Sequence, residues 1–203
     1  MKRLSCFVLL VILAGCDQSG TVDQPGDDPV LARQMQVVAP ADTKPWLAEF
    51  TGKVVKIVDG DTIDVLNDGN TANLGGTTVR IRMNGIDCPE LSQPFGNNAR
   101  QFVSTTIGGG SVRIVPKTLD KSGRTIGDVF LLSRGGTPDL WVNRELVRIG
   151  LAWHYKPFSG DERLAEDEHQ ARLQDIGLWV GSHQPIPPWV WRQLSKEEPD
   201  EYR

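Results

Sequence analysis

The alternation of hydrophobic and polar residues predicts a β-rich domain that begins near Phe50. Short runs rich in β-branched residues, bounded by Gly, Asn and Asp, are typical of strands. The pair Asp59-Gly60 between the first two runs is a hairpin turn signal. The predicted strands cover residues 53–58, 62–66, 78–83, 112–115 and 125–132.

Other segments have a helical period. Residues 97–107 and 142–149 each have apolar side chains on one face, and glycine follows both. Asp161 can N-cap a last helix of about four turns that ends at Gly177. The predicted fold class is therefore α+β: a closed or nearly closed five-stranded β-barrel, compatible with the OB-fold, with about three helices.

The first fifteen residues are typical of an export signal. A basic head at residues 2–3 precedes an apolar run over residues 4–13, which is too short to cross a ~30 Å hydrocarbon core as a helix. The Leu-Ala-Gly-Cys sequence ending at Cys16 resembles the bacterial lipobox, in which cleavage exposes the cysteine and acylation follows. A plain signal peptide with a chance cysteine is the alternative. The resemblance implies a lipid on Cys16 and a bacterial cell-envelope lipoprotein, on the periplasmic or extracellular face of a membrane; Asp17 favours the inner membrane.

Composition divides the chain further. Residues 16–46 are polar and proline-rich without a sustained apolar period, which predicts a flexible tether. Residues 47–192 make up the predicted OB-fold domain, and residues 193–203 form an acidic tail. We expect a monomer, and no feature of the sequence indicates a protein partner.

The net charge restricts how the protein can bind a polyanion. Removal of Lys2 and Arg3 with the signal takes the formal net charge from −4 to −6, whereas non-specific DNA-binding proteins are usually basic. Contact with a nucleic acid must then come from a local basic site or a bound metal ion. Of three cysteines only Cys88 lies in the predicted domain, so a disulfide framework is excluded there, and the three histidines are too scattered for a zinc site.

Three charged motifs lie at the ends of predicted strands, at residues 59–62, 82–90 and 120–124. Each motif alone could be a solvated turn or a polar exit loop. A barrel, however, can bring strand ends to one rim, and together the motifs offer two aspartates, one glutamate and two arginines.

Such a set suits cleavage of a phosphodiester. Arg82 and Arg124 can each hold two phosphate oxygens with a planar fork that stays charged. Asp61 and Asp87 supply the oxygen ligands that a hard divalent cation prefers. Glu90 can orient or deprotonate the attacking water.

The order of these residues resembles the signature of the staphylococcal nuclease (thermonuclease) family: Asp-Gly-Asp-Thr, then Arg with Asp five residues later and Pro-Glu, then Gly-Arg. Residues 141–152 are similar to the family's "VNxxLVxxGLA" helix, and residues 162–179 to its last helix. Residues 186–192 are similar to the "PPWxWR" tail of bacterial secreted members. The resemblance covers about residues 52–192.

What the resemblance implies is a calcium-dependent nuclease that hydrolyses DNA and/or RNA and leaves 3′-phosphates. Threonine is common in the family where Cys88 stands, but a carbonyl ligand does not depend on the side chain. The implied roles are calcium binding by Asp61, Asp87 and the backbone carbonyl of Cys88, phosphate binding by Arg82 and Arg124, and general-base catalysis by Glu90.

The chain departs from the family's pattern before Gly-Arg, where Lys121 and Ser122 replace an aromatic residue that stacks on a base. Stacking could pass to Trp153, His154 or Tyr155. Lys121 could contact a phosphate or merely solvate a turn. The alternative function is a non-catalytic OB-fold module, displayed on the membrane, that binds nucleic acid or oligosaccharide. The intact acidic residues favour catalysis.

Overall fold

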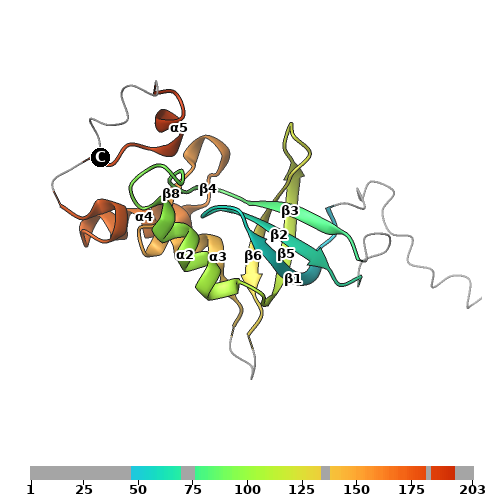
Figure 1. Cartoon of the computed structure of the whole chain (residues 1–203). Helices are drawn as coiled ribbons and strands as arrows, with labels where there is room; N and C mark the ends of the chain where they lie inside the picture. The colour runs from blue at the N-terminus through green and yellow to red at the C-terminus, as the bar shows by residue number, and fades with distance from the viewer. Residues whose placement is uncertain (1–46, 70–75, 134–137, 182–183, 195–203) are drawn as a thin grey trace, which may run out of the picture. The chain divides into compact units, whose positions relative to one another are not determined.

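The computed structural model describes the chain from residue 47 to residue 194, apart from residues 70–75, 134–137 and 182–183 (Figure 1). The predicted export signal, the predicted tether with Cys16 and most of the acidic tail lie outside the described residues, so these boundaries stay predictions. Within the described part of the chain, no helix is both long and apolar enough to cross a membrane.

The strands close into a small barrel. The main sheet has the order β3-β2-β1-β5-β6-β7, and an additional pairing of β3 with β6 closes its first five strands on themselves. The β3–β6 pairing is parallel and the others are antiparallel. The predicted α+β class with a five-stranded OB-fold barrel is confirmed. The strands are β1 (Phe50–Ile57), β2 (Thr62–Asn67), β3 (Thr78–Met83), β4 (Ile86–Asp87), β5 (Ser111–Leu119), β6 (Thr125–Leu131), β7 (Leu140–Trp141) and β8 (Trp153–His154).

Strand β5 shows how the pattern of the sequence builds the core. Val112 and Ile114 point inward and are fully buried, while Arg113 between them is partly exposed. The strand continues to Leu119, four residues beyond its predicted end. The alternation breaks after Pro116 because a bulge shifts the pairing with β6 there. This extension lengthens the β5–β6 hairpin, which reaches the functional site.

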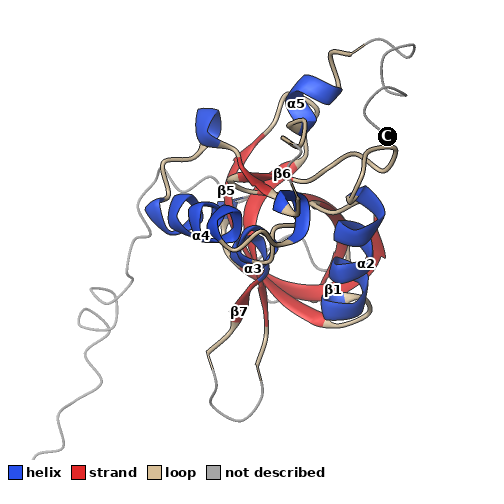
Figure 2. Ribbon diagram, turned by 90° about the vertical axis from the view of Figure 1, so that its left-hand side faces the viewer, coloured by secondary structure: helices blue, strands red, loops and turns tan. Residues whose placement is uncertain are grey.

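Helices cover the barrel on two sides (Figure 2). α2 packs against β1, and α3 packs between β6 and α4. The predicted helices over residues 97–107 and 142–149 are confirmed to within one residue at each end. The helices are α2 (Gly96–Ile107), α3 (Val142–Arg148), α4 (Glu162–Leu173) and α5 (Pro188–Trp191), with short 3₁₀ turns η2 (Lys156–Phe158) and η3 (Gly177–Trp179).

The last predicted helix starts as expected and ends early. Asp161 is the N-cap of α4, and its carboxylate accepts a hydrogen bond from the backbone N–H of Arg163. The helix ends at Leu173 rather than at Gly177, so the predicted end is wrong. Gly177 instead lies against Gly150, where a Cβ would be 2.2 Å from the Gly150 carbonyl oxygen, and its φ is +60°. This glycine is needed for a close backbone crossing, not for a helix end.

A small aromatic cluster stands beside the main core. Trp153 of β8 packs edge-on against Trp179, with ring centroids 4.5 Å apart, and against Trp189, at 5.6 Å. The guanidinium carbon of Arg172 lies 3.8 Å from the centroid of the Trp179 ring. We call residues 186–192 the C-terminal segment. The aromatic cluster joins this segment to β8 and α4.

Candidate active site

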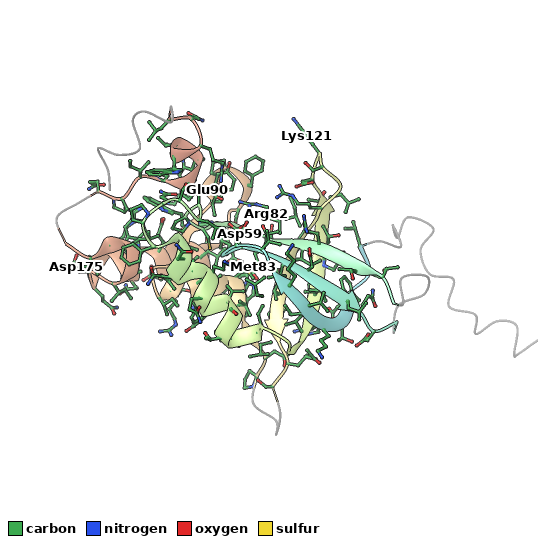
Figure 3. The ribbon with its side chains drawn as sticks, in the orientation of Figure 1. Asp59, Arg82, Met83, Glu90, Lys121 and Asp175 are labelled. Carbon is green, nitrogen blue, oxygen red and sulfur yellow. The ribbon has the colours of Figure 1, made fainter. Side chains whose placement is uncertain are left out.

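The three charged motifs line one pocket of about 730 Å³, which we call the active-site pocket. Asp61 directly precedes β2, Arg82 lies on β3, and Arg124 directly precedes β6. Figure 3 shows Asp59, Arg82 and Glu90 gathered near the base of the β5–β6 hairpin, with Lys121 at its tip. The structure therefore brings together all three motifs that the sequence singled out.

Arg82 joins the two aspartates that were predicted as metal ligands. Its Nη1 lies 2.8 Å from Asp61 Oδ1, and its Nη2 lies 2.5 Å from Asp87 Oδ1. The antiparallel register sets Arg82 opposite Thr62, the residue after Asp61. The other oxygen of Asp61 accepts the backbone N–H of Cys88 at 2.8 Å. Both carboxylates thus lie within reach of one guanidinium.

When no cation is bound, burial destabilises the charged form of Asp61. The pKa of Asp61 is raised from 3.8 to about 7: desolvation is the main cause, the charge of Arg82 opposes it, and the charge of Asp59 adds to it. Asp61 is 2 % exposed and Asp87 is fully buried. The cluster therefore has more negative charge than its arginines offset.

This donor set fits a hard divalent cation. Among the described residues no group of three or more His, Cys, Asp or Glu side chains converges into a complete cage, so two carboxylates and backbone carbonyls would share a cation with water and substrate. The Cys88 thiol is not a donor, because burial raises its pKa and keeps it neutral. It packs into the core beside Gly60 and Ala99, which leaves only its backbone for the predicted role.

Arg124 is placed by the turn of the β5–β6 hairpin. Asp120 accepts hydrogen bonds from Arg124 Nε at 2.6 Å and from the backbone N–H groups of Arg124 and Ser122. Desolvation opposes these bonds, but they keep the pKa of Asp120 below its ordinary value. Lys121 at the tip lines the pocket and forms no ion pair with any described residue. The hairpin thus presents two cations to the pocket.

Comparison with known proteins agrees with this geometry. The family model of the staphylococcal nuclease homologues matches residues 80–181. The chain is 39 % identical over 157 residues to the micrococcal nuclease of Shigella flexneri, covering 75 % of this chain and 86 % of that protein. It is 40 % identical over 164 residues to the protein ParB of Escherichia coli, covering 77 % and 87 %. An uncharacterized endonuclease of Escherichia coli O157:H7 is 35 % identical over 146 residues, covering 71 % and 86 %.

The chain belongs to the staphylococcal nuclease family. It is therefore a nuclease, a hydrolase of phosphodiester bonds. The matched span holds Arg82, Asp87, Glu90 and Arg124, whereas Asp61 precedes it. The individual roles of these residues stay predictions, which their common pocket supports.

One charged residue of this nuclease site was missed by the sequence reasoning. Arg192, the last residue of the C-terminal segment, places Nη2 2.7 Å from Asp87 Oδ2 and Nη1 2.7 Å from Glu90 Oε1. The sequence marked its "PPWxWR" motif only as a family likeness. About one hundred residues separate Arg192 from its partners, so no local pattern could pair them.

The aromatic wall of the nuclease site also differs from expectation. Trp153 and His154 are buried, at 6 % and 3 % exposed, and offer no face to a base. Tyr155 lines the pocket and stacks on Trp189, with ring centroids 5.2 Å apart. Phe158, which the sequence reasoning did not consider, also lines the pocket and is 73 % exposed. Of the three predicted stacking residues, only Tyr155 is in a position to serve.

Proposed function

We propose that this nuclease is calcium-dependent, acts on DNA and/or RNA, and leaves 3′-phosphates. The observation that carries the proposal is the pair of buried carboxylates, Asp61 and Asp87, bridged by Arg82 at the pocket that also holds Glu90 and Arg124. When bound, the cation would neutralise the carboxylates and polarise a phosphoryl oxygen.

The two arginines would receive the scissile phosphate. Arg124 is fixed through Nε and its backbone, so its terminal nitrogens have no partner among the described residues. Arg82 has both terminal nitrogens on carboxylates, and these contacts hold its guanidinium at the pocket, where it can also reach a phosphate oxygen. Such positive charge, already in place before reaction, stabilises the charge that grows on the phosphate oxygens.

Glu90 would activate the water. Its carboxylate is 39 % exposed at the pocket wall, which lets water and substrate reach it. The water oxygen bonds to phosphorus as its proton passes to Glu90, and the bond from phosphorus to the 5′-oxygen breaks. The 5′-oxygen takes up a proton from solvent water and leaves as a hydroxyl, and the phosphate stays on the 3′ side.

The test is cleavage of plasmid DNA, single-stranded DNA and RNA by residues 39–203. Reactions contain calcium, magnesium or chelator, and product ends are identified with 3′- and 5′-labelled oligonucleotides. Glu90→Gln should lose activity, and Arg148→Ala should keep it, because the one ion-pair partner of Arg148 among the described residues is Glu145, outside the pocket. Full activity in chelator, or 5′-phosphate products, would contradict the proposal. No cleavage by folded protein would favour the alternative of a binding module.

We also propose that the nuclease is an exported lipoprotein of the bacterial envelope, anchored through Cys16. The support is the basic head, the short apolar run and the lipobox-like sequence that ends at Cys16. Labelling with a fatty acid should mark the wild-type protein and not Cys16→Ser. Equal labelling of both proteins would rule out this anchor.

A further inference from the structure

The C-terminal segment reaches the active-site pocket through one side chain. The guanidinium of Arg192 donates to both oxygens of Asp87, at 2.7 and 3.3 Å, and to Glu90 Oε1 at 2.7 Å. One planar fork thus joins a predicted metal ligand to the predicted base. Asp87 already receives Arg82 on its Oδ1, so Arg192 is a second arginine on the same carboxylate.

The same segment also holds the loop on which Glu90 lies. Gln93 is buried; its Oε1 accepts the backbone N–H of Glu90 at 3.1 Å, and its Nε2 donates to the Ile186 carbonyl oxygen at 2.6 Å. Trp191 Nε1 lies 3.4 Å from Ser92 Oγ. Loop and segment therefore meet at three places, and the contact with Arg192 is the one that faces the pocket.

Arg192 is itself held before substrate arrives. Its neighbour Trp191 is 7 % exposed, and Trp189 packs between Tyr155 and Trp153. Side chains that are packed and hydrogen-bonded hold a site in its working geometry better than mobile surface residues do. The arginine differs in this respect from a free surface cation.

Glu90 depends on this contact for its direction. Among the described residues Arg192 is the sole ion-pair partner of Glu90. Without the guanidinium, Glu90 could sample several rotamers, and the negative charge of Asp87 would repel its carboxylate from the pocket. A base that is turned away from the water gives slow turnover although substrate still binds.

We propose that Arg192 is a positioning residue of this nuclease: it fixes Glu90 beside Asp87, so that the C-terminal segment completes the active site. The inference rests on the proposed role of Glu90 as general base. It extends the site past residue 181, where the match to the family model ends. A merely inhibitory arginine, which blocks the carboxylates until it is displaced, would have the opposite effect on activity.

The kinetic test compares Arg192→Ala and Arg192→Lys with wild type, in the wild-type and Glu90→Gln backgrounds. Arg192→Ala should lower kcat about 10- to 100-fold, as loss of such supporting contacts does, with KM for DNA changed by less than about threefold. Arg192→Lys should restore part of kcat, because one ammonium can still reach one carboxylate. In the Glu90→Gln background, Arg192→Ala should cause little further loss. Unchanged or raised kcat, or an equal loss in both backgrounds, would overturn the proposal.

A second measurement does not depend on catalysis. Hydrogen exchange is followed in peptides covering residues 88–96 with chelator present. The Gln93 and Gly96 amides there donate to the carbonyls of Glu90 and Gln93. These amides should exchange faster in Arg192→Ala than in wild type. In the control Arg148→Ala, their exchange rates should equal those of wild type. Unchanged exchange would overturn the positioning role. If the wild type cleaved nothing with calcium, the proposed function would fail. The exchange measurement would still decide whether Arg192 holds the loop.

Discussion

Replacing Asp61 with asparagine should make the metal-free protein more stable at pH 8, although it removes a predicted metal ligand. The reason is that burial raises the pKa of Asp61 to about 7, well above 3.8. The folded form therefore keeps a proton on Asp61 at pH values where the unfolded chain has lost it. The stability that Asp61 contributes is full below pH 4 and is lost as the pH rises through about 7.

The size of the effect follows from that pKa. At about 1.4 kcal/mol per pH unit, a rise from 3.8 to about 7 corresponds to about 4 kcal/mol of stability lost between pH 3 and pH 8. Asparagine has one acceptor oxygen where Asp61 uses two, on Arg82 and on the Cys88 N–H. An unsatisfied donor costs about 1–3 kcal/mol, so we expect a net gain of about 1–3 kcal/mol at pH 8.

The assay is urea unfolding followed by tryptophan fluorescence, from pH 4 to pH 8 with chelator present. The wild type should lose stability over this range relative to Asp61→Asn, since the other titrating groups are common to both proteins. Asp64→Asn is the opposite control: its hydrogen bonds with Arg80 lower its pKa, so the ion pair stabilises the fold above pH 4, and the variant should be less stable there. Parallel curves for wild type and Asp61→Asn would contradict this prediction.

Four other substitutions test separate parts of the site. Arg124→Ala should lower kcat/KM at least about 100-fold and leave the unfolding midpoint nearly unchanged, because its side chain is partly exposed. Arg82→Ala should lose activity and also about 3–5 kcal/mol of stability, since two buried carboxylates lose a partner; urea unfolding checks this. Gly96→Ala should destabilise the fold, because its Cβ would lie 1.9 Å from the Glu90 carbonyl oxygen, and a raised or equal midpoint would contradict this. Phe158→Ala should raise KM for single-stranded DNA about five- to tenfold if a base stacks there, and an unchanged KM would exclude that contact.

The sequence was enough to predict the barrel because β1, β3 and the first part of β5 follow a period of two. Val112 and Ile114 of β5 alternate with more exposed neighbours, and the turn residues Asp59 and Gly60 mark the first hairpin. The charged motifs were found because each lies at a strand end, where a barrel rim brings separate segments together. The predicted end of β5 is too early because the alternating pattern is lost at the bulge that follows Pro116.

Strands of two residues, such as β4 and β8, are too short to show an alternating pattern in the sequence. β4 and β8 pair only Ile86 with His154 and Asp87 with Trp153, so their pairing comes from tertiary packing. That pairing buries Trp153 and His154, which the sequence alone offered as stacking residues. It leaves Tyr155, the next residue along the chain, at the pocket.

The charges of the active-site pocket explain how an acidic protein can act on a polyanion. With Asp87 included, five carboxylates, those of Asp59, Asp61, Asp87, Glu90 and Asp120, face four cations, those of Arg82, Lys121, Arg124 and Arg192. The excess of one negative charge favours binding of a cation, and it agrees with the raised pKa of Asp61. Replacing Arg82 or Arg192 with a neutral residue increases this excess of negative charge. The metal-free variants should then bind calcium more tightly and cleave more slowly, because the arginines oppose the cation while they serve the chemistry.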